Sequence, residues 1–311
     1  MKISLHLGAH KTATTYIQQV LRRNIAYLAQ RRVLYIPLNE TREGFTDAAS
    51  KPVRKPMRML KRYRTKRRCS AFLKKHLTIP PDSDLSPYRR LILSDENLIG
   101  SPSRTVRSGE IYNQAHKRLA ELRLHLASYE VEIFFAIRQQ GSFASSIFAE
   151  AIGQDSPFHL DDQAFRKKWL RNRPSWVPTV QTLANTFPNA TIYLWDFEAL
   201  SEIEDEIFSL LAGTDDLLHL SRKLSPIRQS LSQRTIELLL EVQAKNGPAA
   251  RSKHRREFRL AHPRNALNPA YTLWTPEELQ TFDVDFAKDL EAFANMGPQI
   301  QLLTSLQGKA A

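Results

Sequence analysis

Leu5-His-Leu-Gly-Ala-His-Lys-Thr-Ala-Thr-Thr-Tyr-Ile-Gln18 is the stretch that decides the fold of this chain. A short apolar run begins almost at the N-terminus, breaks at Gly8, and leads through Lys11 and three threonines into a helical pattern. The predicted order is strand, turn, helix. Backbone N–H groups at the start of a helix favour an anion. Because an ammonium and three hydroxyls lie beside them, the turn predicts a site for a phosphate or sulfate group.

Composition allows one large α/β domain, because the chain has 311 residues and its 42% hydrophobic content suffices for a sizeable core. A single cysteine, Cys69, excludes an internal disulfide and a cysteine-rich metal site. The first residues lead directly into the turn instead of forming a secretory leader. No apolar run reaches the roughly 18 residues that a membrane span needs. We therefore expect a cytoplasmic protein.

The positive charge of the chain is concentrated in one block. The net charge is +13, and residues 51–75 carry twelve Lys or Arg and no Asp or Glu. We predict a basic insertion at about 51–80 that is helical from about Met57 to His76. Such a block binds nucleic acid, anionic lipid or an acidic glycan. Nucleic acid is not expected, because no zinc finger, RNA-binding signature or helix-turn-helix pattern accompanies the block.

Short apolar runs separated by helical patterns indicate the fold class. The predicted strands are 2–7, Val33–Pro37, Arg90–Ser94, Val131–Ile137 and Ala190–Trp195. The predicted helices, besides the two already mentioned, are Gly109–Ser128, a helix from about Ser142, Val177–Thr186, Glu202–Leu211, Gln233–Gln243 and Pro276–Ala294, whereas Asn39–Ser50 predicts a loop. This alternation predicts a single α/β domain over 1–311, a three-layer sandwich around a central parallel sheet. Ligands of such sheets bind beyond the carboxyl ends of the strands.

Two adjacent carboxylates follow the strand that ends at Ser94. Burying both Asp95 and Glu96 is costly unless they have a partner or a purpose. A carboxylate near an anion site can accept a proton from an attacking hydroxyl, whereas a helix cap or a salt bridge is the structural alternative. Consecutive strand residues point to opposite faces, so one of the two faces a ligand, and we choose Glu96. No His, Cys and carboxylate cluster has the spacing of metal ligands, so no metal is expected.

A third polar cluster follows the strand that ends at Ile137. Arg138 offers the planar fork of donors that matches a phosphate. Ser142 and Ser146 share a helix face because they lie four residues apart. The carboxyl ends of parallel strands meet at one edge of a sheet, so we expect all three clusters to form one site.

The clusters together resemble sulfotransferases that use 3′-phosphoadenosine 5′-phosphosulfate (PAPS), in particular the bacterial and carbohydrate-type members. The family's loop is roughly G-x-x-K-[ST]-G-T-T, and only Ala13 departs from it, at a position that is usually glycine. If the turn needs a positive φ there, alanine costs about 1 kcal/mol or less. The triphosphate loop G-x-x-x-x-G-K-[ST] does not match, because His10 precedes Lys11.

The resemblance extends over about residues 1–20 and 90–200. Arg138 and Ser146 lie eight residues apart, the spacing with which the family binds the 3′-phosphate of its donor. Gln139-Gln140 replaces the usual Asn/Asp-Pro. The stretch from Tyr193 to Leu200 is similar to the family's late strand and the Tyr-Glu-x-Leu that follows it.

The resemblance implies transfer of a sulfuryl group from PAPS to an acceptor hydroxyl without a metal. Lys11 would neutralise the leaving phosphate, and Glu96 would be the base, with Asp95 and His10 as alternatives. His10 could instead bond the loop or lie over the donor. The residues implied to bind the donor are Gly8, Ala9, His10, Lys11, Thr12, Ala13, Thr14, Thr15, Arg138 and Ser146.

The basic block suggests what the acceptor is. It lies in sequence between the loop helix and the carboxylate strand, so we expect it at the mouth of the cleft. Arg62, Arg64 and Arg67 would then bind an anionic glycan or glycolipid, in peripheral contact with the anionic inner face of the membrane. Two other functions remain open. A nucleotide-dependent kinase would need Mg²⁺ and a triphosphate, and a non-catalytic polyanion-binding protein would not prefer adenosine 3′,5′-bisphosphate.

Overall fold

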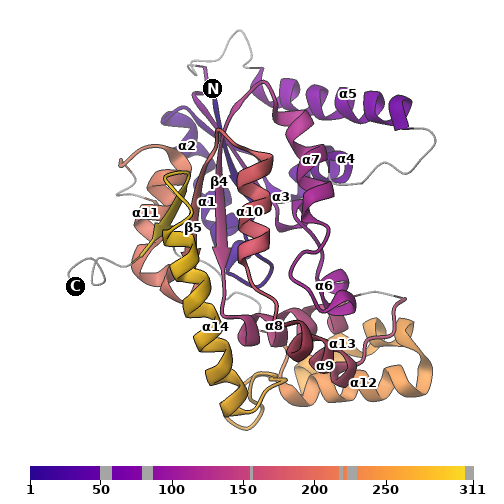
Figure 1. The fold of residues 1–311 in the computed structure, drawn as a ribbon. Coiled ribbons are helices and arrows are strands. Elements are labelled where there is room, and N and C mark those ends of the chain that lie inside the picture. Colours follow the sequence, from indigo (N-terminus) through magenta and orange to yellow (C-terminus); the bar gives the residue numbers. More distant parts are fainter. Residues whose placement is uncertain (50–57, 79–86, 155–156, 217–219, 223–229, 305–311) are drawn as a thin grey trace.

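The computed structural model describes residues 1–49, 58–78, 87–154, 157–216, 220–222 and 230–304, without the side chains of 58–63. Within these residues six parallel strands form one sheet in the order β2-β3-β1-β4-β5-β6, and helices flank it (Figure 1). The strands are β1 (Lys2–His6), β2 (Val33–Tyr35), β3 (Arg90–Ser94), β4 (Glu130–Ile137), β5 (Thr191–Asp196) and β6 (Ile300–Leu303). The predicted α/β fold with a central parallel sheet is confirmed.

Helices account for most of the remaining described chain. They are α1 (Thr14–Arg23), α2 (Ile25–Gln30), α3 (Leu38–Thr41), α4 (Asp47–Ala49), α5 (Arg58–Leu77), α6 (Pro102–Ser108), α7 (Ala115–Leu126), α8 (Gln140–Gly153), α9 (Asp162–Asn172), α10 (Val177–Thr186), α11 (Leu200–Ala212), α12 (Gln233–Asn246), α13 (Arg251–Ala261) and α14 (Pro276–Ala294). Short helical turns are η1 (Arg42–Thr46), η2 (Glu96–Leu98), η3 (Phe197–Ala199) and η4 (Pro248–Ala250).

Two hydrophobic cores lie on the two faces of the sheet. Leu91 and Leu93 of β3 pack into one core, and Ile92 between them packs into the other. This alternation follows from the period of two in a strand. The first core contains residues of α7, α8, α10 and α14, and the second contains residues of α1 and α11. The strands are therefore buried on both faces, as continuous apolar runs in a parallel sheet require.

Strand β1 is central to the sheet. It pairs with β3 on one side and β4 on the other, in register from Lys2 opposite Arg90 and Glu130. The loop after β1 therefore leaves the sheet between the carboxyl ends of its two neighbours. The edge strand β6 was not predicted, because its four residues provide too short a pattern.

The prediction of a loop over Asn39–Ser50 is wrong for the described part of this segment. The chain there is helical through α3, the π-helical turn η1 and α4, and Ser50 lies outside the described residues. Phe45 and Ala49 are fully buried in the core, which explains why this polar stretch takes a helical form. Tertiary packing thus outweighs the weak helical pattern of the sequence.

The predicted helix Gly109–Ser128 is confirmed only from Ala115 onward. Gly109 has a φ of 71° and ends α6, which the sequence analysis did not predict. Glycine at this position is a common helix C-cap because the left-handed conformation costs it little. Helix α14 begins with a capping box, in which the side chain of Thr275 accepts from the backbone N–H of Glu278 and the side chain of Glu278 accepts from the backbone N–H of Thr275.

The basic helix is present as α5, close to its predicted bounds. Its buried residues Cys69 and Leu73 anchor it, and it packs on α4, α7 and η1. Phe72 lies so close to Gly44 of η1 that a Cβ on the glycine would collide with the ring. The apolar stripe of α5 therefore determines which way its cations point.

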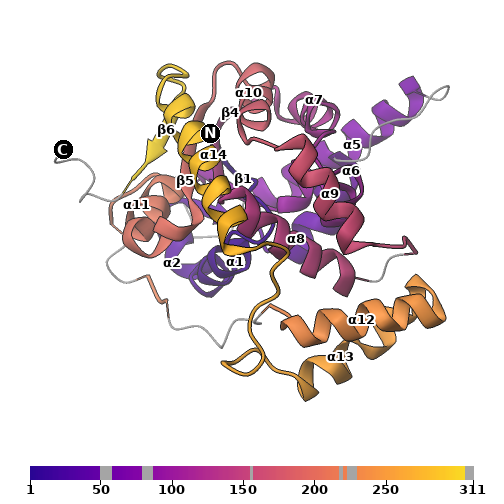
Figure 2. The ribbon, with the colours of Figure 1, turned by 60° about the horizontal axis from the view of Figure 1, so that its bottom comes forward.

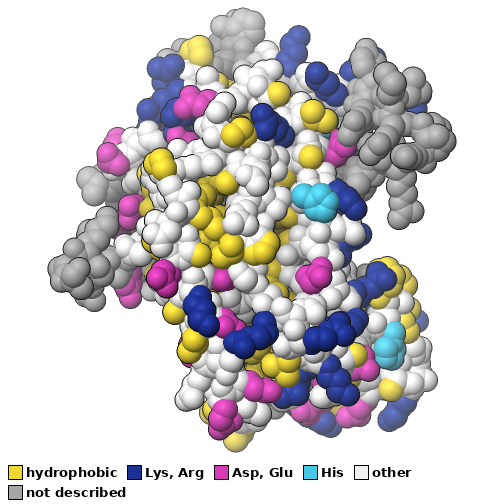
Figure 3. All heavy atoms as spheres, in the orientation of Figure 1, with side chains coloured by type: hydrophobic (Ala, Val, Ile, Leu, Met, Phe, Trp, Pro, Cys, Tyr) yellow, Lys and Arg dark blue, Asp and Glu magenta, His cyan; other side chains and the backbone are white. Residues whose placement is uncertain are grey.

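Cations of α9 face acids of α14 and join the two helices. Arg166 is paired with Glu278, and Arg173 with Asp285 at 2.6 Å. Figure 3 shows Lys and Arg side chains gathered over the lower part of this face, where α9 and α14 lie. The positive charge of the surface is therefore not confined to α5.

A helical hairpin of α12 and α13 lies against α8, as Figures 1 and 2 show. Arg251 is fully buried in it and donates to Gln243 at 2.8 Å and to the carbonyl of Phe158 at 3.1 Å. The amide of Gln243 also bonds both the N–H and the carbonyl of Leu160. These contacts fasten the hairpin to the segment that precedes α9.

Candidate active site

A cavity of about 790 Å³ lies beyond the carboxyl ends of β1, β3, β4 and β5. This volume falls within the range of roughly 300–1,000 Å³ that holds small-molecule ligands. Its lining combines the loop after β1, one face of α8, and segments that flank the α12–α13 hairpin. The lining residues on which the site depends are His10, Lys11, Ala13, Thr14, Thr15, Arg42, Glu96, Asn97, Arg138, Ser142, Ser146, Glu150, Gln154, Phe197, Glu198 and Arg264.

The loop after β1 has a strained backbone. Gly8, Lys11 and Ala13 have φ values of 43°, 67° and 59°. The sequence indicated a cost at Ala13 if the turn required a positive φ, and the turn does. A left-handed conformation costs a residue with a Cβ about 1–2 kcal/mol. Strain of this kind gathers where a loop must hold a fixed shape around a ligand.

Hydrogen bonds within the loop maintain its shape. The hydroxyls of Thr12 and Thr14 donate to the carbonyl of Ala9 at 2.6 and 3.3 Å. Of the residues predicted to bind the donor, Gly8, Ala9 and Thr12 are not among the described residues that line the cavity. These three residues lie on the side of the loop that faces away from the cavity, where Ala9 and Thr12 are fully buried.

Helix α1 begins with its first turn open toward the cavity. Its N-cap, Ala13, makes no side-chain cap bond, and the first turn carries no acidic residue. Thr14 and Thr15 line the cavity at this end. Uncapped N–H groups together with the helix dipole provide an anion site.

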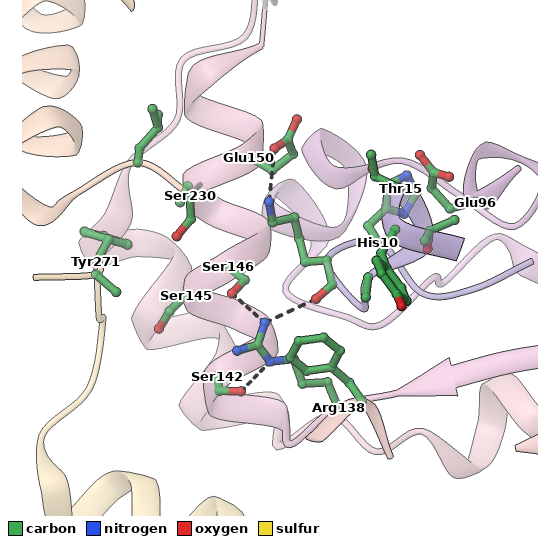
Figure 4. A pocket seen from close by; sticks show the side chains of 18 of the residues that line it. His10, Thr15, Glu96, Arg138, Ser142, Ser145, Ser146, Glu150, Ser230 and Tyr271 are labelled. Carbon is green, nitrogen blue, oxygen red and sulfur yellow. Dashed lines mark hydrogen bonds and ion pairs between the residues drawn. The ribbon is translucent and has the colours of Figure 1, made fainter. Parts of the chain in front are cut away.

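Arg138 connects the loop to α8. Its Nη1 donates to the carbonyl of Lys11 at 3.2 Å and to Ser146 Oγ at 3.0 Å, and its Nε donates to Ser142 Oγ at 2.8 Å (Figure 4). The ring of Phe197 lies 4.7 Å from the guanidinium carbon. Burial lowers the pKa of Arg138, and the charge of Glu198, 3.6 Å away, opposes that shift.

The ammonium of Lys11 lies 3.5 Å from Glu150 of α8. The two side chains are 27% and 30% exposed. At this distance and exposure the ion pair is weak, of the order of 1 kcal/mol or less. Lys11 can therefore exchange this partner for an anionic ligand at little cost.

Arg42 pairs with both carboxylates that follow β3. It lies 3.2 Å from Asp95 Oδ1 and 2.8 Å from Glu96 Oε1. Asp95 is fully buried and caps η2 by accepting from the N–H of Asn97 at 3.0 Å. Glu96 lines the cavity, whereas Asp95 is not among the described lining residues.

The two carboxylates differ in their proton affinity. Burial raises the pKa of Asp95, and the neighbouring charge of Glu96 raises it further against the opposing effect of Arg42. Burial also acts to raise the pKa of Glu96. The charge of Arg42 and a hydrogen bond from Gln18 oppose it, and the pKa of Glu96 lies below its usual value. Glu96 is therefore ionised at neutral pH.

His10 lines the cavity with both ring nitrogens bonded. The hydroxyl of Tyr112 accepts from the backbone N–H of His10 at 2.8 Å, so its own proton points to Nδ1, also at 2.8 Å. Nε2 then carries the ring proton and donates to Asn97 Oδ1 at 3.2 Å. Burial lowers the pKa of His10. The neutral ring holds the loop in place, and neither nitrogen is free to accept a proton from a ligand.

Several residues of the site were missed by the sequence analysis. Arg42 lies in the segment predicted as a loop, and nothing in its local pattern indicates its partners. Glu150 follows Ser146 by four residues, so extending the helix face by one turn would have included it. Arg264, which donates to Ser230 at 3.1 Å, belongs to a second basic stretch of the sequence.

The described part of the basic block lies away from the cavity, contrary to expectation. Arg64 and Arg67 are exposed on α5, and the side chain of Arg62 lies outside the described residues. No described residue that lines the cavity comes from α5. Figure 1 shows α5 toward the amino ends of the strands, whereas α8 lies at their carboxyl ends. The packing of α5 on α4 and α7 accounts for this placement.

The described residues also bear on metal binding and on membrane insertion. Among these residues, no cluster of three or more His, Cys, Asp or Glu side chains is arranged to hold a metal ion. None of the described helices combines the length and the apolar composition required to cross a membrane.

Comparison with known proteins gives one structural likeness. No protein-family model matches the chain, and no curated protein matches it. The chain is similar to the crystal structure of a sulfotransferase from Alicyclobacillus acidocaldarius, with a TM-score of 0.39 and 13% sequence identity. The matched region covers 82% of this chain and 98% of that chain.

Proposed function

We propose that this protein is a sulfotransferase that transfers a sulfuryl group from PAPS to a hydroxyl of an acceptor. The observation that carries the proposal is the position of Arg138, within hydrogen-bond distance of both the Lys11 carbonyl and Ser146. One guanidinium thus connects two candidate anion sites in a single cavity. A nucleotide with phosphates on both sides of its ribose needs such a pair of sites.

The residues present fit that donor. The open first turn of α1, with Lys11, Thr14 and Thr15, would hold the 5′-phosphosulfate end. Arg138 and Ser146 would hold the 3′-phosphate, because a guanidinium fork and a hydroxyl supply directed donors.

The chemistry of the site would be positioning and charge stabilisation. When bound, the donor supplies a sulfuryl group already activated by its link to phosphate. Lys11 would place its ammonium beside the negative charge that develops on the phosphate side. Glu96 is the base predicted from the sequence, and it is held ionised in the cavity by Arg42 and Gln18. Asp95 and His10 are less suited, because the first does not line the cavity and the second has both nitrogens bonded.

We further propose that the acceptor is a glycan or glycolipid. The support is the set of exposed cations on α5, among them Arg64, Lys74 and Lys75. Because α5 lies away from the cavity, these cations would contact an anionic part of a large acceptor, or an anionic membrane face, at a distance from the transfer point. A small acceptor would not reach both.

Binding of adenosine 3′,5′-bisphosphate tests the proposal most directly. We expect it to raise the melting temperature of the protein, since a ligand at one hundred times its Kd stabilises by about 2.7 kcal/mol. Arg138→Ala should weaken binding at least about tenfold, because hydrogen bonds from a charged group contribute about 1.5–3 kcal/mol. Arg171→Ala, at an exposed arginine of α9 outside the cavity, is the matched control and should bind as the wild type does.

The same measurement of the melting temperature distinguishes the two other functions, a kinase and a polyanion-binding protein, from the proposed one. A larger shift with ATP that disappears in the presence of a chelator would identify a nucleotide-dependent kinase. A shift with heparin but with neither nucleotide would identify a polyanion-binding protein. Equal binding by Arg138→Ala and the wild type would remove the 3′-phosphate site from the proposal.

A further inference from the structure

One face of α8 forms a wall of the cavity. Ser142, Ser146 and Glu150 follow each other at intervals of four residues, so they share this face, and Gln154 continues it just past the helix end. Arg138 bonds the two serines, and Lys11 pairs with Glu150 (Figure 4). Each of the two cations predicted to bind the donor thus has its partner on α8.

Glu150 is held far more loosely than Glu96, the carboxylate predicted to be the base. Its two oxygens have contacts of 3.5 Å, one with Lys11 and one with Gln154. Glu96 instead has a 2.8 Å ion pair with Arg42, and its side chain is only 17% exposed against 30% for Glu150. Contacts at 3.5 Å lie at the limit of a hydrogen bond. The carboxylate of Glu150, which lies beside Lys11, is therefore more accessible to an incoming hydroxyl than that of Glu96.

We propose, on the basis of the proposed function, that Glu150, in place of Glu96, is the catalytic carboxylate that takes the proton of the acceptor hydroxyl. When an anionic donor draws the Lys11 ammonium to itself, Glu150 loses its counter-ion and is left beside the reacting groups. The freed oxygen can then accept a hydrogen bond from the hydroxyl of the acceptor. The exchange of partners by Lys11 thus prepares Glu150 to accept a proton.

In the transfer of the sulfuryl group, one bond to sulfur forms and one breaks. The acceptor oxygen forms a bond to sulfur while the bond from sulfur to the bridging oxygen of the donor breaks. The phosphate side leaves with the electron pair, next to the Lys11 ammonium. The hydroxyl proton passes to Glu150 Oε2. No redox partner or metal enters the balance.

The same position restricts the acceptor. Glu150 and Gln154 present a carboxylate and a carboxamide beside Lys11, which suit the hydroxyls of a neutral sugar. A negative group at this point would face Glu150 and be repelled. The part of the acceptor that receives the sulfuryl group is therefore uncharged, and any anionic part lies outside this section of the cavity.

Glu150→Gln separates the two consequences of the proposal. The variant should bind adenosine 3′,5′-bisphosphate about two- to fivefold more tightly by titration calorimetry, because Lys11 no longer gives up an ionic partner. Its turnover of PAPS, with glycerol as a polyhydroxyl acceptor or with water, should fall about a hundredfold or more. Glu150→Asp should recover part of the turnover. Glu202→Gln, at an exposed carboxylate of α11, is the control and should match the wild type in both measurements.

The binding and turnover results for Glu150→Gln test different parts of the proposal. Unchanged or weaker bisphosphate binding by Glu150→Gln would overturn the exchange of partners by Lys11. Turnover within about threefold of the wild type would overturn the catalytic role. If the wild type itself fails to bind the bisphosphate, the proposed function fails, whatever Glu150 does.

Discussion

Replacing Gly8 with alanine should disrupt the loop after β1. The glycine has a φ of 43°, and a Cβ added there would lie 2.5 Å from Thr14 Oγ1 and 3.3 Å from His6 Nε2. Thr14 cannot yield easily, because it is β-branched, buried in the first turn of α1, and bonded to Ala9. The new methyl group therefore meets atoms that are fixed by the fold.

Two contributions, one from the backbone and one from packing, make up the expected loss in the free energy of unfolding. The left-handed backbone costs an alanine about 1 kcal/mol or somewhat more. Forcing a methyl group into the packed space behind the loop adds about 1–3 kcal/mol. Gly8→Ala should therefore lower the free energy of unfolding by about 2–4 kcal/mol. Gly297→Ala is the control, because it has a φ of 89° with nothing within 4 Å of the added Cβ, and it should show the backbone cost alone.

Urea unfolding followed by tryptophan fluorescence provides the measurement. In a Thr14→Ala background, which lacks the two threonine atoms near the added methyl group, the Gly8→Ala substitution should cost about 1–2 kcal/mol less than in the wild type. The affinity for adenosine 3′,5′-bisphosphate should fall with the loop. If Gly8→Ala is no more destabilising than Gly297→Ala, or if the Thr14→Ala background makes no difference, the close packing behind the loop is refuted.

Three other substitutions have defined outcomes. Lys11→Ala should reduce turnover below a tenth of the wild type, a loss of transition-state stabilisation above about 1.4 kcal/mol. The melting temperature should hardly change because the side chain is partly exposed. Retained turnover would remove Lys11 from the mechanism. Arg42→Met removes the cation that stabilises ionised Glu96, so the pKa of Glu96 rises. Because Glu150 takes the proton, the pH–rate profiles of variant and wild type should superimpose, and an acid limb that moves to higher pH would restore Glu96 as the base. Burial lowers the pKa of His6 from 6.5 to about 4, so between these pH values the unfolded chain binds more protons than the folded one. The free energy of unfolding of the wild type therefore falls by up to about 3 kcal/mol on acidification. In urea titrations His6→Gln should lose less of its free energy of unfolding between pH 7 and 4.5, and an equal loss in both proteins would contradict this.

The loop after β1 could be predicted because its determinants are contiguous. Gly8, Lys11 and the threonines lie within one turn and the start of one helix, so local spacing alone indicates an anion site. The cost expected at Ala13 also followed from one residue's backbone preference. The parallel direction of the strands needed only the alternation of strands and helices, which places all carboxyl ends at one edge of the sheet.

The remainder of the site depends on tertiary packing. Arg42 reaches Asp95 and Glu96 only because η1 is folded as a helical turn beneath Phe72 of α5, and no local pattern specifies that contact. The placement of the basic block failed for a similar reason. Its position in the sequence suggested the mouth of the cleft, but the buried stripe of Cys69 and Leu73 directs α5 elsewhere.

The central place of β1 has a consequence for how the chain is made. Lys2–His6 is translated well before its neighbours in the sheet, Arg90–Ser94 and Glu130–Ile137. An apolar strand without partners is exposed to aggregation during that interval. The nascent chain can therefore pair both sides of β1 only after Arg138 has emerged, and a pause in translation before that point would prolong the exposure.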